Sequence, residues 1–170
     1  MAERLKAAAR RFVADVNARG GLQPVTTAIV LREGEEAYFD EQAVLLETRS
    51  VRQSRGMGLA FRIARGIYLG GGDRYSESAP LLRRIDKGRL VMTNKRLIFD
   101  GATENRTIVL KDIISFTPYL TAVEVSVASR AKSMIFKLKN PVICATVGQI
   151  LCRYDNPQAV DSIQLTVKIR

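Results

Sequence analysis

The chain has 170 residues, of which 46% are hydrophobic, and a formal net charge of +10, which predicts one globular domain with a core large enough to fold unaided. No run approaches the roughly 18 consecutive apolar residues that a membrane-spanning helix needs. Charged residues recur through the first 18 positions, so no secretory signal peptide is expected. The predicted location is cytoplasmic, with a peripheral position at the inner face of the membrane left open.

The two cysteines, Cys144 and Cys152, lie eight positions apart in a segment with helical periodicity. This spacing places their Cα atoms about 12 Å apart, whereas a disulfide needs less than about 7 Å. Both thiols are therefore expected to be reduced and buried.

Charge is distributed unevenly along the chain. Up to Thr48 there are 6 basic and 8 acidic residues, whereas from Arg49 onward there are 21 basic and 9 acidic residues. Such an excess indicates an anionic partner, such as membrane headgroups, nucleic acid or an acidic protein. A well-solvated basic surface without any partner explains the same pattern.

Hydrophobic periodicity predicts the elements of the first part of the chain. Apolar residues at helical spacing predict a helix over 3–18, which Gly20 and Gly21 end. The β-branched residues of 25–31 predict a strand. The segment 35–47 holds a short strand or a short helix, and its pattern does not decide between them.

The remainder of the chain is predicted to be rich in short strands. Alternation over 59–69 predicts a strand, 70–73 form a glycine-rich turn, and 74–80 are polar and irregular. Two alternating runs around Thr93, Asn94 and Lys95 predict a tight hairpin over 88–101. The other expected elements are strands over 107–110, 112–116, 123–127 and 133–138, a helix over 140–154, and a final half-buried strand over 162–169.

The predicted order of elements defines a fold class. Many short strands separated by turns, with one helix near the end, are typical of a mainly β fold, a small barrel or sandwich closed by a helix. Asn140 suits the N-cap of that helix, and Pro141 suits its first position. Residues 1–22 are interpreted as a helical extension, and 23–170 as the domain itself.

The segment from Gly88 to Gly101 resembles the core hairpin of bacterial PH-like domains, which are related to the GRAM and pleckstrin-homology folds. The resemblance continues through 108–116 and covers roughly 25–154. It implies two near-orthogonal antiparallel sheets, with a C-terminal helix over 140–154 that plugs one open end.

Two features depart from the family pattern. The helix often carries a Trp in this family, and the chain has none, so Tyr154 or Ile150 is expected to fill that position. The strand over 162–169 is additional, and it either extends a sheet, pairs with 25–31, or offers an edge to a partner. Because such barrels host many unrelated functions, the resemblance implies a fold more specifically than a ligand.

Catalytic and metal-binding functions are not expected. The chain has no His, so the commonest general base and the Ser-His and Cys-His arrangements are absent. Two cysteines at this spacing do not suit zinc, and the glycines of 66–72 are not followed by the Lys-Ser/Thr of a phosphate loop. The acidic residues of 33–47 lack the spacing of a calcium loop. The chain is predicted not to be an enzyme and to need no cofactor or metal.

The strongest candidate site is an arginine- and glycine-rich segment, in which six Arg and one acidic residue fall between Arg49 and Arg74. Guanidinium groups bind phosphate oxygens in a bidentate way, and nearby apolar side chains can insert shallowly between lipids. The competing interpretation is that these arginines solvate the outer face of a strand. A second basic group lies over 83–96. The predicted ligands of an anionic headgroup are Arg52, Arg55, Arg62, Arg65, Arg74, Lys95 and Arg96.

Three functions remain open at this point. The leading hypothesis is a non-catalytic PH/GRAM-like module that docks on an anionic phospholipid surface. The first alternative is a protein-interaction or assembly module, including a homo-oligomer, that uses the barrel edge or the final strand. The second is nucleic-acid binding, for which an aromatic content of 6% leaves few stacking platforms.

Overall fold

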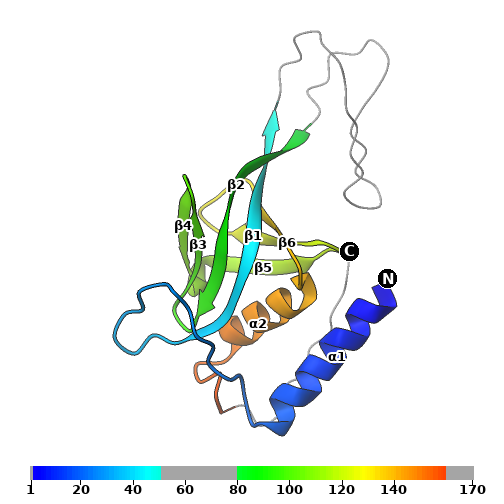
Figure 1. Cartoon of the computed structure of the whole chain (residues 1–170), viewed down its shortest axis with the longest axis vertical. Helices are drawn as coiled ribbons and strands as arrows, with labels where there is room; N and C mark the ends of the chain where they lie inside the picture. Colours follow the sequence, from blue (N-terminus) through cyan, green and yellow to red (C-terminus); the bar gives the residue numbers. More distant parts are fainter. Residues whose placement is uncertain (1, 51–79, 160–170) are drawn as a thin grey trace.

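The computed structural model describes residues 2–50 and 80–159, which form one curled antiparallel sheet and two helices (Figure 1). The helices are α1 (Ala2–Ala18) and α2 (Pro141–Arg153), and a single 3-10 turn, η1 (Leu110–Asp112), precedes β5. The strands are β1 (Ala37–Ser50), β2 (Pro80–Thr93), β3 (Arg96–Gly101), β4 (Asn105–Val109), β5 (Ile113–Pro118), β6 (Ala122–Val127) and β7 (Met134–Leu138).

The seven described strands lie in the order β4-β3-β2-β1-β7-β6-β5, and all neighbours are antiparallel. The sheet consists of two meanders, β1–β4 and β5–β7, which join where 43–46 of β1 pair with 135–138 of β7. A bulge leaves Ile85 as an extra residue on β2, and bulges increase the local twist. The result is a half-barrel, which confirms the prediction of a mainly β fold with a C-terminal helix.

The core joins the two meanders. The rings of Phe99 in β3 and Phe136 in β7 lie 5.6 Å apart at an interplanar angle of 41°, a tilted arrangement that aromatic pairs favour. Each fully buried side chain of this size contributes roughly 1.5–3 kcal/mol through burial. Other large, fully buried side chains in the same core are Leu45, Leu90, Met92, Leu97, Met134 and Ile150.

Helix α2 covers one end of the half-barrel, opposite the end at which β1 stops and β2 begins (Figure 1). Gly148 permits its approach to β5, because a Cβ there would come within 2.5 Å of the Phe116 ring. Of the two residues proposed to replace the family's Trp, Ile150 is fully buried in the core, and Tyr154 is partly buried against it.

The start of α2 differs in part from the prediction. Asn140 is the N-cap and Pro141 lies in the first turn, as expected, but the Asn140 side chain makes no capping hydrogen bond. The Asn140 side-chain amide donates instead to Glu41 Oε2 at 3.1 Å. Glu41 Oε1 also accepts the backbone N–H groups of Lys139 and Asn140. A carboxylate on β1 therefore positions the entry to the helix.

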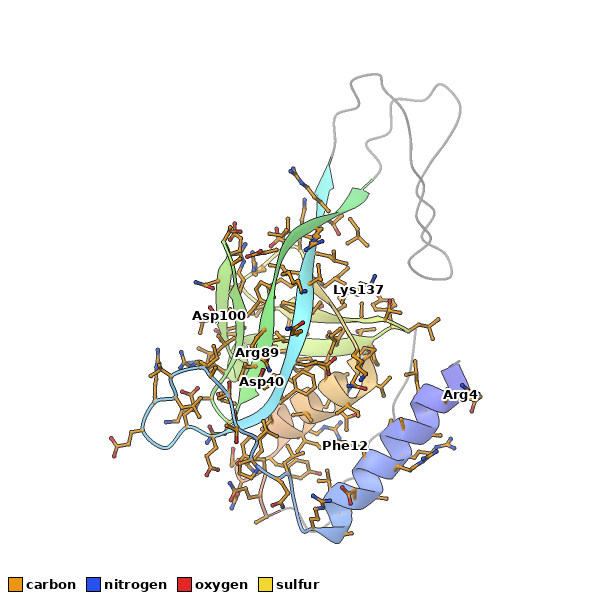
Figure 2. The ribbon with its side chains drawn as sticks, in the orientation of Figure 1. Arg4, Phe12, Asp40, Arg89, Asp100 and Lys137 are labelled. Atoms are coloured by element: carbon orange, nitrogen blue, oxygen red, sulfur yellow. The ribbon has the colours of Figure 1, made fainter. Side chains whose placement is uncertain are left out.

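Helix α1 confirms the predicted N-terminal helix and packs against α2 (Figure 2). Val16 is buried in the core, and Phe12 packs against the core. Gly20 ends the helix with φ of +76°, a left-handed conformation that favours glycine. A Cβ at Gly21 would come within 2.3 Å of the backbone of Gln158, so this glycine lets the chain after α2 lie against the chain after α1.

The prediction of a strand over 25–31 is wrong. This segment is irregular in the structure, and apart from Val25 N–H donating to Ala37 C=O its contacts are not those of a strand. Two of its apolar residues cover the sheet instead, because Ile29 and Leu31 pack on the outer side against Val91 and Ile98. The segment 35–47, which was ambiguous, belongs mainly to β1.

The remaining predictions are mostly confirmed. The hairpin over 88–101, the strands that follow it and the C-terminal helix are all present, although β2 begins earlier, at Pro80. Both cysteines are free as expected, but only Cys144 is buried, since Cys152 is exposed. The predicted strands over 59–69 and 162–169, the turn over 70–73 and most of the irregular segment before Pro80 lie outside the described residues.

The close pairing of β2 with β3 requires glycine at position 88. A Cβ on Gly88 would lie 2.0 Å from the backbone O of Asp100, which cannot move without disturbing β3. We expect Gly88→Ala to lower the free energy of unfolding by about 1–3 kcal/mol, measured by urea denaturation. Lys87→Ala, at the exposed neighbouring position, is the control and should change stability little. Equal stability of Gly88→Ala and the wild type would contradict this packing.

Candidate functional site

Buried polar side chains fix the β2–β3 turn to the loop 30–36. Arg96 Nε donates to Glu35 Oε1 at 2.7 Å, and Arg96 Nη2 donates to Oε2 at 3.0 Å. Thr93 Oγ1 donates to Glu35 Oε1 at 2.7 Å, and the backbone N–H of Arg32 donates to Oε2 at 2.8 Å. We call Glu35, Thr93 and Arg96 the turn lock.

The side chains of the turn lock are almost completely buried. Glu35 is 5% exposed and Thr93 is fully buried. The bond from Arg96, aided by those from Arg32 and Thr93, holds the pKa of Glu35 at about 2, below its ordinary value of 4.5, although burial acts in the opposite direction. Removing either charge would leave the other buried without its partner, which is far more costly than losing an exposed pair.

The other turn side chains also bind the same loop. Asn94 Oδ1 accepts the backbone N–H of Glu36 at 3.0 Å, and Asn94 Nδ2 donates to the Gly34 C=O at 3.0 Å. Lys95 Nζ donates to the Glu33 C=O at 2.7 Å. Lys95 and Arg96, which the sequence proposed as headgroup ligands, thus both have partners within the fold. Contact with a headgroup stays a prediction for these two residues.

Exposed basic side chains gather at the opposite end of β2. Arg83 and Arg84 follow the start of β2, and Arg130 and Lys132 lie in the β6–β7 turn. Lys132 Nζ donates to the C=O of Thr48 at 3.2 Å, which places this turn beside the end of β1. We call Arg83, Arg84, Arg130 and Lys132 the basic rim.

An acidic residue organises one side of the basic rim. Glu47 Oε1 lies 3.5 Å from Arg106 Nη2 and 3.8 Å from Arg130 Nη2. Arg106 also pairs with Glu104 at 2.5 Å. Glu47 is therefore shared by two arginines, and it leaves Arg83, its cross-strand neighbour in the β1–β2 register, exposed. The rim keeps an excess of positive charge.

The sequence grouped the basic residues of 83–96 together, whereas the structure separates them. Arg83 and Arg84 lie at the basic rim, and Lys95 and Arg96 lie in the turn at the far end of the same long strand. The sequence does not single out Arg130 and Lys132, because only the antiparallel pairing of β1 with β7 brings the β6–β7 turn to this end. The sequence signal for this site is the presence of two basic residues, Arg130 and Lys132, within one turn between two strands.

Five predicted ligands, Arg52, Arg55, Arg62, Arg65 and Arg74, lie outside the described residues. Their attachment points are described, because Ser50 and Pro80 face each other in the β1–β2 register. Ser50 and Pro80, the described residues on either side of 51–79, therefore lie at the end of the sheet opposite α2, the end that carries the basic rim (Figure 1). The fold adds four exposed basic side chains to the base of that segment.

The outer face of the sheet carries a basic side chain whose partner lies within the fold. Arg89 of β2 lies beside Asp40 of β1, with Nη2 to Oδ1 of 2.7 Å (Figure 2). Because the Arg89 side chain is 44% exposed, this pair contributes little.

Within 2–50 and 80–159, no three His, Cys, Asp or Glu side chains come together as a metal site. Neither described helix has the length and apolar composition to cross a bilayer.

Comparison with known proteins assigns no family to the chain. No protein-family model matches the chain, and no curated protein matches it either.

The turn lock is expected to dominate the stability of the β2–β3 turn. Arg96→Met should lower the free energy of unfolding by about 3 kcal/mol, because Glu35 would keep a buried charge without its partner. In a double-mutant cycle, Glu35→Gln combined with Arg96→Met should cost clearly less than the two single changes added together. Urea denaturation of the four proteins checks this. Additive costs would show that the two side chains act independently.

The low pKa of Glu35 predicts a stability that depends on pH. The folded pKa of about 2 lies below 4.5, so the contribution is complete above about pH 4.5 and is lost as the pH falls toward 2. We expect wild type to exceed Glu35→Gln by about 3 kcal/mol at pH 7 and by much less near pH 2. Asp86, whose pKa is also held at about 2 by backbone N–H groups, cancels in this difference. A gap independent of pH would contradict the ion pair.

Proposed function

We propose that this chain is a non-catalytic, PH-like and GRAM-like binding module that docks on an anionic phospholipid surface through its basic rim and the arginine-rich segment attached there. The observation that carries the proposal is that the basic rim lies beside Ser50 and Pro80, the described residues that flank the arginine-rich segment. The segment 51–79 begins and ends where Arg83, Arg84, Arg130 and Lys132 are exposed.

The arrangement of elements supports the PH-like part of the proposal. Two antiparallel meanders of four and three strands precede a helix that covers one end of the half-barrel. The family resemblance implies the same succession, with a helix closing one open end. The described strands form one continuous curled sheet. The two separate near-orthogonal sheets of a PH-like fold are therefore part of the proposal only.

The position of the basic rim suits a flat anionic partner. It occupies the end of the molecule away from α2, so neither helix stands between it and a membrane surface (Figure 1). Each Lys or Arg close to an anionic surface contributes about 1 kcal/mol. The four rim residues alone therefore give weak attraction, and the arginines of 51–79 would strengthen it.

The chemistry of the rim favours phosphate over other anionic groups. Three of its four members are arginines, whose planar guanidinium binds two phosphate oxygens at once. Glu47 holds Arg130 and Arg106 from one side, so Arg130 is oriented before any ligand arrives. Such pre-orientation lowers the entropy lost on binding. The docked protein would lie at the cytoplasmic face of a membrane.

Vesicle co-sedimentation tests the proposal. Full-length protein should bind vesicles with anionic phospholipid at low salt, bind weakly at high salt, and ignore neutral vesicles. A rim variant, Arg83→Ala/Arg84→Ala/Arg130→Ala/Lys132→Ala, should bind at least roughly tenfold more weakly, since about 1 kcal/mol is lost per side chain.

The control removes three basic side chains from the other end of the molecule, against four in the rim variant. Arg4→Ala/Arg10→Ala/Arg11→Ala changes exposed residues of α1 and should leave vesicle binding within about twofold of the wild type. A second variant, Arg52→Ala/Arg55→Ala/Arg62→Ala/Arg65→Ala, tests the segment 51–79 directly. Equal losses in the rim and α1 variants would mean that only net charge matters. Absence of binding under every condition would refute the proposal.

A further inference from the structure

The outer face of the sheet divides into two halves. The loop before β1 covers one half, where Ile29 and Leu31 pack on the sheet. The other half lies over β1 and β7, and its side chains alternate with the buried core residues of the same strands. The described side chains of this second half are partly or fully exposed.

Three partly exposed apolar side chains form a patch on this second half. Val44 and Leu46 lie two positions apart on β1, on the face opposite the core residue Leu45. Ile135 of β7 is the direct cross-strand neighbour of Leu46. In the part of the chain that the structure describes, none of the three belongs to either cluster of packed apolar side chains. The patch is therefore apolar surface that neither cluster uses.

Basic side chains bracket the apolar patch. Val44 pairs with Lys87 of β2 on one side and with Lys137 of β7 on the other, so all three lie on the same face (Lys137 is labelled in Figure 2). Both lysines are exposed, and neither forms an ion pair within 2–50 and 80–159. Arg84, at the border with the basic rim, is the neighbour of Leu46. We call Val44, Leu46, Ile135, Lys87 and Lys137 the outer strip.

The acidic groups close to the outer strip have other partners. Glu124 of β6 is the cross-strand neighbour of Ile135, and its carboxylate accepts the Tyr119 hydroxyl at 2.6 Å. Asp40 of β1 pairs with Arg89. The two lysines of the strip therefore keep their positive charge uncompensated, which complements an acidic partner.

The dimensions of the outer strip match a helix. The backbone of β1 is already paired with β2 and β7, so a partner cannot add a strand here and must use its side chains. Neighbouring strands lie about 4.8 Å apart, which places the Cα atoms of Lys87 and Lys137 about 10 Å apart, close to the diameter of an α-helix. Val44 and Leu46 lie about 6.6 Å apart along β1, and one helical turn rises about 5.4 Å.

We propose that the outer strip binds an amphipathic helix of a partner protein, with an apolar stripe along β1 and acidic side chains on both flanks. A second copy of this chain fits poorly, because each copy carries a net charge of +10 and the two repel each other. Nucleic acid also fits poorly, because the strip has no aromatic side chain on which bases stack. The outer strip and the basic rim are different surfaces, so this proposal does not depend on membrane docking.

A synthetic peptide tests the outer strip in the full-length protein. The probe is a fluorescein-labelled helix of about 18 residues, with Leu at every third or fourth position and Glu on both flanks of this stripe. The control probe has the same composition and charge in an order that removes the stripe. Fluorescence anisotropy should show that the protein binds the amphipathic peptide at least roughly tenfold more tightly than the control peptide.

Protein variants locate the binding site. Lys87→Glu/Lys137→Glu should weaken binding of the amphipathic peptide at least roughly tenfold, because two attractions become repulsions. Lys111→Glu/Arg153→Glu makes the same change of charge at exposed positions of η1 and α2 and should stay within about threefold of the wild type. Leu46→Gln should weaken binding without a change of charge, which keeps the test valid if the lysine variant misfolds. Circular dichroism checks the fold of each variant.

Each outcome decides the proposal. A preference for the amphipathic peptide that the folded strip variants lose supports it. Equal affinity for the two peptides, no binding of either, or equal losses in the strip and control variants would overturn it. Loss of anionic-vesicle binding in Lys87→Glu/Lys137→Glu, with peptide binding intact, would assign the strip to the membrane and overturn it. A dimer in light scattering that Leu46→Gln dissociates would assign the strip to a second copy, with the same consequence.

Discussion

The buried pair of Glu35 and Arg96 is the constraint on which one end of this structure depends. Two charges that are shielded from water must remain together, because either alone is costly to bury. The pair holds the β2–β3 turn against the loop 30–36, and this loop in turn covers Val91 and Ile98 on the outer side of the sheet. The turn residues Asn94 and Lys95 add bonds to the same loop. The charged side chains of Glu35 and Arg96 therefore bind within the fold, whereas the four side chains of the basic rim at the opposite end are exposed.

The two ends of the half-barrel differ in what covers them. Helix α2 covers one end, where its Gly148 lies close to the Phe116 ring. The carboxylate of Glu41 on β1 accepts the backbone N–H groups of the two residues that precede the helix. The other end has no described helix and carries the basic rim at the base of the segment 51–79. Under the proposed function, stability and binding are separated in space, so substitutions at the rim that test function need not disturb folding.

Much of the fold follows from periodicity, while the partners of individual polar residues do not. Strict alternation around Thr93 predicts the central hairpin, and Pro141 predicts the start of α2, because both signals act within a few residues. The segment 25–31 has the composition of a strand, yet Ile29 and Leu31 cover the sheet instead, a choice made by tertiary packing. Sequence alone could not select Glu35 among its acidic neighbours as the partner of Arg96, nor bring the β6–β7 turn to Thr48, since both contacts join distant parts of the chain.

The central claim is that the basic rim, and not merely a positively charged molecule, faces an anionic membrane. The chain has no tryptophan, so a single introduced tryptophan reports its own depth through quenching by brominated lipids. Ala131→Trp places the probe in the β6–β7 turn between Arg130 and Lys132, and Ala14→Trp places it on the exposed side of α1. The account predicts strong quenching at position 131 and little at position 14 on anionic vesicles. Equal quenching at both positions, or stronger quenching at position 14, would contradict it.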